Sequence, residues 1–314
     1  AEAVETAVKI ARRWAYEKKG VPENQAQIVV CKNNFHGRTT TVISFSNDEG
    51  AKKNFGPFTD GFIQVAYSDE GALEEVFKAN PNIAAFLVEP IQGEAGVFVP
   101  ADGFLAKARA LCDAHNVLMI CDEIQTGIAR TGKLLASCGN CTCPNRDCSE
   151  TPEVKPDLLI LGKAISGGAY PVSAVLANKP IMEVITPGSH GSTFGGNPVA
   201  AKVAMAALDV VKEERLAENA FQLGNLFRVL MQEYIDKSNV VRLVRGKGLL
   251  NAIVINDSEE SDTAWNICMR LRDHGLLAKP THGNIIRFAP PLVMTEAQLK
   301  ECVDIIVKTL KEFE

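Results

Sequence analysis

The chain has 314 residues, 46% of them hydrophobic and 23% charged, which is a composition typical of globular proteins. Its formal net charge of −5 argues against a nucleic-acid or anionic-membrane partner, and no apolar stretch approaches the ~18 residues of a membrane span. The length predicts one large domain and a smaller one.

The first eight residues already have the pattern of a helix interior, without an N-cap residue before them. We therefore expect that an amino-terminal part of the sequence is missing. No signal peptide is visible, and we expect a cytoplasmic location. The mitochondrial matrix stays open, since a targeting segment could belong to the missing part.

Short apolar strands alternate with helices over most of the chain. In order, we expect a helix at 2–18, strands at 28–31 and 41–45, a helix at 71–79, a strand at 83–88, a helix at 104–115, strands at 117–121, 158–161 and 172–176, and helices at about 198–215 and 216–236. This alternation predicts an α/β fold with a doubly wound, mostly parallel sheet.

The pattern changes after about residue 237. We expect strands at 241–244 and 249–255, a helix at 262–274, a strand at 285–288 and a last helix at 295–313. Thr295 stands three residues before Gln298, as in a capping box. The sequence predicts a large α/β domain over residues 1–237 and a smaller α+β domain over 238–314.

Lys163 and Asp122 each follow an apolar run of strand length. In an open α/β sheet, ligands bind outside the carboxyl ends of the strands, so both side chains are expected in one crevice. A lysine facing an aspartate is what pyridoxal phosphate requires, because the amine forms a Schiff base and the carboxylate holds the ring nitrogen protonated. The alternative is a solvated loop lysine and a helix-capping aspartate.

Other polar residues also lie at the ends of predicted strands or in the loops that follow them. Glu89 ends a third apolar run, and Gln125 stands just beyond Asp122, where an amide can donate to a ring hydroxyl. A loop of glycines and hydroxyls at 188–198 precedes a helix and can surround a phosphate, although such loops are common.

Aromatic and basic side chains also occur at two other predicted strands, after one strand and within the other. In Phe35-His36-Gly37-Arg38, the ring can stack on a planar cofactor and the arginine can bind a carboxylate, whereas the histidine alone is more typical of a packed turn. Arg287 lies between apolar residues of a predicted strand, where an outward-facing edge position is the alternative.

Together these segments resemble the class III aminotransferases of the pyridoxal-phosphate fold type I group, and within it most closely the ornithine aminotransferases. The matching segments are 35–39, 88–96, 122–127, 161–168, 190–198, 245–252 and 279–291.

The resemblance implies pyridoxal 5'-phosphate as cofactor and a homodimer with shared active sites. Lys163 would bind the cofactor and move the proton, and Asp122 would pair with the pyridinium. The other residues implied at the cofactor are Gln125 at the ring hydroxyl, Phe35 and His36 at the ring, Ser192 and Thr193 at the phosphate of the other subunit, and the amide near Ala1 at the phosphate of its own subunit.

The implied reaction transfers the δ-amino group of L-ornithine to 2-oxoglutarate, giving glutamate 5-semialdehyde and glutamate. Arg287 would bind the α-carboxylate of the dicarboxylate and Arg38 the distal one, while Glu94 would pair with Arg287 when ornithine enters and Glu89 would shape the site. Acetylornithine or 4-aminobutyrate as amino donor, or an inactive cofactor-binding relative, are the alternatives. The absent amino-terminal segment, and a histidine at position 36 where some ornithine enzymes have tryptophan, weaken the substrate assignment more than the chemistry.

The nine cysteines fall into two groups. Four crowd one loop and could bind zinc or stay free or oxidised; their spacing matches no paired zinc pattern well, and we assign no metal to Cys138, Cys141, Cys143 and Cys148. The others are expected to be small buried residues: Cys31, Cys112, Cys121, Cys268 and Cys302.

Overall fold

The computed structural model describes residues 2–138 and 154–314, and the side chain of Cys138 is outside the description. The chain forms two compact units. Unit 1 comprises Ala1–Pro90, Pro100–Gln125 and Ser137–Leu208, and unit 2 comprises Ile91–Val99, Thr126–Ala136 and Asp209–Glu314. The predicted division into domains at residue 237 stays a prediction.

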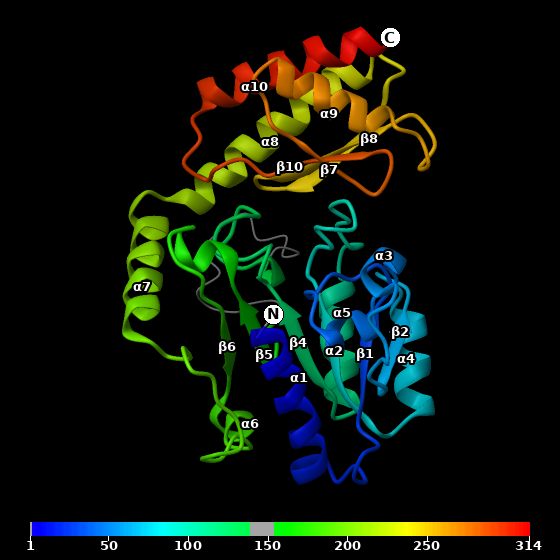
Figure 1. Cartoon of the computed structure of the whole chain (residues 1–314), viewed down its shortest axis with the longest axis vertical. Helices are drawn as coiled ribbons and strands as arrows, with labels where there is room; N and C mark the ends of the chain where they lie inside the picture. The colour runs from blue at the N-terminus through cyan, green and yellow to red at the C-terminus, as the bar shows by residue number, and fades with distance from the viewer. Residues whose placement is uncertain (1, 139–153) are drawn as a thin grey trace. The chain divides into compact units, whose positions relative to one another are not determined.

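Unit 1 is built on a mostly parallel sheet (Figure 1). Across the sheet, its strands follow the order β2 (Phe62–Val65), β1 (Gln27–Cys31), β3 (Ile83–Val88), β4 (Leu118–Asp122), β5 (Leu158–Leu161) and β6 (Ala174–Ala177). The strands from β2 to β5 are parallel and β6 is antiparallel to β5. The chain proceeds from β1 outward to β2 and then returns to β3 on the other side, so the strand order reverses between β1 and β3.

Helices cover both faces of this sheet, as predicted for a doubly wound fold. Ile28 and Val30 pack in one core with α1 (Glu2–Trp14), which continues as a π-helical turn at Ala15–Lys19. Val29 and Cys31 pack in a second core on the opposite face. This alternation follows from the twofold period of a strand. The second core also contains residues of α4 (Glu70–Ala79) and α5 (Phe104–Ala114).

The predicted strand at 41–45 is wrong, because these residues form the helix α2 (Thr40–Ser44). The β-branched residues favour a strand locally. A helix, however, brings Val42 and Phe45 onto one face, and both are buried in the α1-side core. The edge strand β2 was not predicted. The remaining helices of this part are α3 (Glu49–Lys52), α6 (Lys179–Met182) and α7 (Pro198–Glu213).

Unit 2 contains an antiparallel sheet with helices on one face. The strand order is β7 (Val241–Lys247), β8 (Leu250–Ile255), β10 (Ile285–Phe288) and β9 (Lys279–Thr281), and the helices are α8 (Leu216–Ile235), α9 (Thr263–Asp273) and α10 (Glu296–Leu310). Ile286 and Phe288 pack in the core that these helices share, whereas Ile285 packs against Ile91 and Val97 on the other face. The predicted capping box at the start of α10 is confirmed.

Within the described ranges, no helix combines the length and the apolar character needed to cross a membrane.

Candidate active site

The predicted cofactor residues of unit 1 follow the carboxyl ends of neighbouring strands. His36 lies beyond β1, Glu89 follows β3, Asp122 ends β4, and Lys163 lies two residues after β5. The strand order reverses between β1 and β3, the strands that His36 and Glu89 follow, and open α/β sheets bind their ligands outside the carboxyl ends of the strands at such a position. The parallel register therefore gathers residues that are up to 127 positions apart in the sequence, from His36 to Lys163.

Asp122 and His36 form a buried pair. The two side chains belong to residues that are 4% and 3% exposed, and Nδ1 of His36 donates to Oδ2 of Asp122 over 2.7 Å. The other carboxylate oxygen accepts from the backbone N–H of Ile124 at 3.0 Å. Burial disfavours the imidazolium, but the hydrogen bond and charge of Asp122 outweigh it, so the pKa of His36 is raised. The pair thus keeps a carboxylate in a fixed orientation at the strand end.

Glu89 adds a second buried carboxyl group. Its Oε2 accepts from the backbone N–H of Phe35 at 3.0 Å, and its own carbonyl accepts from the hydroxyl of Tyr67. Burial is the main reason that the pKa of Glu89 rises to about 7; His36 and Lys163 oppose the rise and Asp122 reinforces it. A carboxyl group with this pKa changes protonation state near neutral pH.

Lys163 opens a short 3-10 turn, Lys163–Ser166, with a positive φ of 45°. A non-glycine residue seldom adopts this conformation, and such strain is concentrated at functional sites. The preceding Gly162 allows close packing, since a Cβ there would meet side-chain carbons of Ile124 at 3.2 Å. The exposed lysine side chain is therefore placed by a turn that lies directly against the segment after Asp122.

The other predicted residues of unit 1 have varied surroundings. Phe35 is half-buried, and the guanidinium of Arg38 lies 5.6 Å from the centre of its ring. Gln125 is half-buried, whereas Ser192 and Thr193 are exposed in the segment before α7. Ala1 lies outside the described residues.

The predicted pair of unit 2 is present as an ion pair. Arg287 lies on β10, on the face that Ile91–Val99 covers, and is 13% exposed. Its Nη1 donates to Oε2 of Glu94 at 2.7 Å and to the carbonyl of Gly93 at 3.2 Å. Their roles toward substrate stay predictions.

A third residue, Lys279, completes this group and was missed by sequence reasoning. Its Nζ donates to Oε1 of Glu94 at 2.5 Å. Burial would raise the pKa of Glu94, but the hydrogen bonds from Lys279 and Arg287 lower it to about 2. The strand β9, only three residues long and containing a proline, gives no period-two signal that could have placed Lys279 beside Arg287.

The residues of unit 1 fit pyridoxal phosphate. A buried, already hydrogen-bonded carboxylate at Asp122 can hold a protonated ring nitrogen, and an amine at Lys163 can bond to an aldehyde. The half-buried Phe35 offers a ring face and Gln125 an amide, as the cofactor's planar ring and hydroxyl require.

The cysteine predictions are partly confirmed. Four of the scattered cysteines are buried, whereas Cys302 is only half-buried. The crowded cysteine loop, and with it the zinc alternative, lies outside the residues whose side chains are described.

Residues 1–310 match the family described as Aminotransferase class-III. The mitochondrial ornithine aminotransferase of Drosophila melanogaster is 56% identical over 309 residues, which cover 98% of this chain and 68% of that protein. The corresponding rat protein is 53% identical over 312 residues, covering 99% of this chain and 67% of its own length.

Solved structures agree with this relationship. The ornithine aminotransferase of Toxoplasma gondii, described with partial occupancy of pyridoxal phosphate at its active site, is 47% identical with a TM-score of 0.91, covering 98% of this chain and 70% of that one. The acetylornithine aminotransferase of Elizabethkingia anophelis is 58% identical with a TM-score of 0.85, covering 100% of this chain and 72% of that one.

Proposed function

This chain belongs to the class-III aminotransferase family, and we propose that it transfers the δ-amino group of L-ornithine to 2-oxoglutarate, giving glutamate 5-semialdehyde and glutamate. Pyridoxal phosphate is its cofactor. The ion pair between Glu94 and Arg287 supports a terminal amino donor together with a dicarboxylate acceptor, and the 56% identity to the ornithine aminotransferase of Drosophila melanogaster supports ornithine as that donor. The ion pair gives unit 2 a carboxylate-binding arginine that an internal carboxylate can neutralise.

When bound, pyridoxal phosphate supplies an aldehyde that takes up an amino group and a protonated ring that withdraws electrons from the reacting carbon. Asp122 would hold the proton at the ring nitrogen, and the buried hydrogen bond from His36 keeps the carboxylate oriented. Lys163 supplies the amine that holds the cofactor and afterwards moves a proton as general base. Gln125 would donate to the ring hydroxyl and Phe35 would pack on the ring face.

The two substrates differ in charge, and Glu94 and Arg287 suit both. Ornithine carries a second amino group. With Glu94 on Arg287 the arginine is neutralised and does not attract the α-carboxylate, so the δ-amine rather than the α-amine is directed to the cofactor. 2-Oxoglutarate carries two carboxylates, and Arg287 binds one of them once Glu94 releases it. Arg38 is proposed for the other carboxylate and Glu89 for the shape of the pocket.

We also propose that the chain works as a homodimer, with Ser192 and Thr193 contacting the phosphate bound by the other subunit. Both residues are exposed in the single chain. They are followed by exposed apolar side chains, with Phe194 70%, Val199 55% and Met205 55% exposed. Apolar side chains gathered on one segment in this way are typical of surfaces that a partner covers.

The second candidate is acetylornithine as amino donor, favoured by the 58% identity to the Elizabethkingia anophelis enzyme. The site residues are compatible with both donors, so the relative rates with ornithine and acetylornithine distinguish the two functions. The test below also has two other possible outcomes: a reaction with 4-aminobutyrate as donor, or binding of the cofactor without turnover.

The first test is the absorbance spectrum of the purified protein with pyridoxal phosphate. We expect a band from cofactor bound to the lysine, its loss in Lys163→Ala, and its retention in Lys155→Ala, which removes an exposed lysine four residues before Leu159 of β5. Addition of ornithine should then convert the band faster than acetylornithine or 4-aminobutyrate. A band that persists in Lys163→Ala, or a faster reaction with either rival donor, would contradict the proposal.

A further inference from the structure

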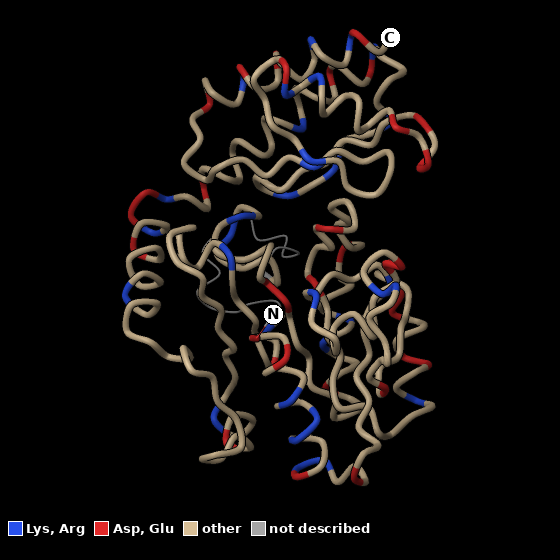
Figure 2. The backbone as a smooth tube through the Cα atoms, in the orientation of Figure 1, with Lys and Arg blue, Asp and Glu red and all other residues tan. Residues whose placement is uncertain are grey.

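Three basic residues form a row across one face of the unit 2 sheet. The register pairs Arg245 with Ala252, Ala252 with Arg287, and Arg287 with Lys279. Residues directly opposite one another in antiparallel strands share a face, so these side chains all lie on the face that Ile91–Val99 covers. Lys and Arg positions are visible along these strands in Figure 2. This face is therefore suited to anions.

Arg287 and Lys279 are a like-charged pair directly opposite each other, which destabilises a sheet unless an anion lies between them. Glu94 is that anion, since its Oε2 accepts from Arg287 and its Oε1 from Lys279. Arg245 is held differently, by the carbonyl of Gly96 at 2.9 Å and by the ring of Phe98 at 3.8 Å. Within this row, the Glu94 carboxylate bridges Arg287 and Lys279, and each of these two cations binds a different carboxylate oxygen.

We propose that Lys279 determines how readily the enzyme accepts its dicarboxylate substrate, because it keeps hold of Glu94 when Arg287 releases Glu94 to bind the substrate. This inference rests on the proposed function. Without Lys279, releasing Arg287 would leave the Glu94 carboxylate without a cation beside the incoming carboxylate. With Lys279, the released carboxylate stays neutralised, so the exchange of partners costs less free energy.

The backbone around Glu94 is anchored independently of its carboxylate. The hydroxyl of Thr281 donates to the carbonyl of Glu94, and Arg287 donates to the carbonyl of Gly93. Thr281 lies two residues beyond Lys279 on the same strand, and therefore on the same face. Exchange of partners at Arg287 then requires a rotation of the Glu94 side chain only.

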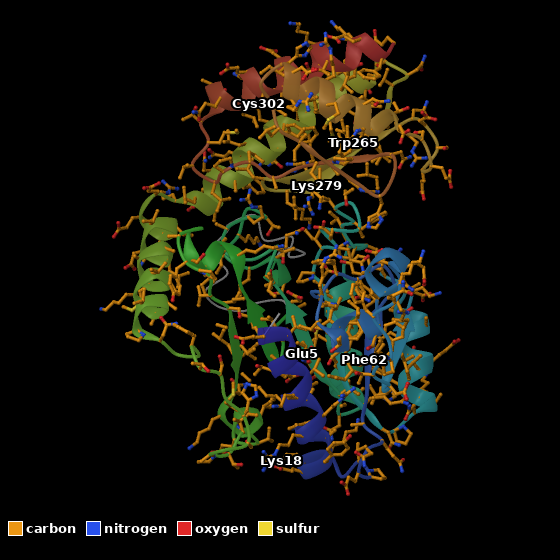
Figure 3. All side chains as sticks on the ribbon, viewed as in Figure 1. Glu5, Lys18, Phe62, Trp265, Lys279 and Cys302 are labelled. Carbon is orange, nitrogen blue, oxygen red and sulfur yellow. The ribbon has the colours of Figure 1, made fainter. Side chains whose placement is uncertain are left out.

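The two cations differ in solvent exposure in the way that such an exchange requires. The side chain of Arg287 is 13% exposed, whereas that of Lys279 is 61% exposed. Lys279, labelled in Figure 3, lies on β9. A flexible, mostly solvated ammonium can follow the carboxylate, while the guanidinium stays in place for a planar substrate carboxylate. With both cations in place the pKa of Glu94 is lowered to about 2, so the carboxylate is ionised when the exchange begins.

The test compares the two half-reactions in single turnovers of the cofactor-loaded enzyme. For Lys279→Met we expect the half-saturating concentration of 2-oxoglutarate to rise roughly three- to fivefold, the upper part of the range for loss of an exposed ion pair. The ornithine half-reaction and the maximal rate with 2-oxoglutarate should stay within about twofold of wild type, and Lys279→Arg should restore the wild-type value. The matched control is Lys300→Met, which removes an exposed lysine paired with Glu296 on α10.

The double variant decides the mechanism. In a Glu94→Gln background, Lys279→Met should change 2-oxoglutarate binding by less than about twofold, because there is no carboxylate left to hold. An equal loss in both backgrounds would mean that Lys279 acts directly on the substrate, and an equal slowing of both half-reactions would mean a structural role; either result overturns the inference. A wild-type enzyme that does not react with ornithine would refute the proposed function instead. The comparison of the single and double variants with 2-oxoglutarate would still test Lys279, because the amino form of the enzyme can be prepared with another amino donor.

Discussion

Replacing Glu94 by glutamine should convert the masked arginine into a permanent carboxylate site. The substitution keeps the size of the side chain and removes its charge. The expected result is tighter binding of 2-oxoglutarate and a slower reaction of ornithine, because Arg287 is then always available to carboxylates, including the α-carboxylate of ornithine.

The structure sets the size of the effect. The pKa of Glu94 is lowered from 4.5 to about 2, which corresponds to roughly 3 kcal/mol of favourable interaction with its surroundings. Two cations share this interaction, so about half belongs to Arg287, and the 22% exposure of Glu94 reduces it further through solvent screening. About 1 kcal/mol of masking remains, which corresponds to a roughly fivefold tighter binding of 2-oxoglutarate.

The assay follows the absorbance of the bound cofactor after rapid mixing. Enzyme carrying the amino group is mixed with 2-oxoglutarate, and enzyme carrying the aldehyde is mixed with ornithine, each over a range of concentrations. Glu296→Gln, which removes an exposed glutamate paired with Lys300, serves as the control. If Glu94→Gln leaves 2-oxoglutarate binding unchanged or weakens it, Glu94 does not mask Arg287 and the reasoning is refuted.

Four further substitutions test the buried pair and the packing. Asp122→Asn should slow both half-reactions by roughly 30-fold or more, since an amide cannot pair with a protonated ring nitrogen; single-turnover rates within about threefold of wild type would contradict this. The pKa of His36 is raised in the fold, so its charge contributes stability that is fully present below its unfolded pKa and is lost as pH rises through the folded value. The advantage of wild type over His36→Gln in urea unfolding should therefore shrink as pH rises from 6, and an advantage that grows would refute the assignment. Gly224→Ala should destabilise by about 3 kcal/mol or more, because its Cβ would lie 1.8 Å from the carbonyl oxygen of Gly248. Gly275→Ala, at φ 89° in open space, should cost only about 1 kcal/mol in the same urea titrations.

Most elements near the candidate site could be predicted from the sequence. The strands β3 and β5 are apolar throughout, and β4 is apolar up to its last residue, Asp122, because parallel strands are buried on both faces. Glu89 directly follows β3, and Lys163 lies two residues after β5. Local signals failed at Thr40–Ser44, where β-branched residues favour a strand but burial of Val42 and Phe45 on one face selects a helix.

The sequence by itself determined the fold class and the family, and it supplied Lys163, Asp122, Glu94 and Arg287 as candidate site residues, because residue type and position at the end of a strand are local properties. Only the tertiary structure decided which groups share a proton or a charge. His36 is buried against Asp122, and Lys279 stands opposite Arg287, through pairings between segments that lie far apart in the chain or on strands too short to show a period. The strengths of these contacts depend on burial and on distances of a few ångströms, and neither is written in the order of the residues.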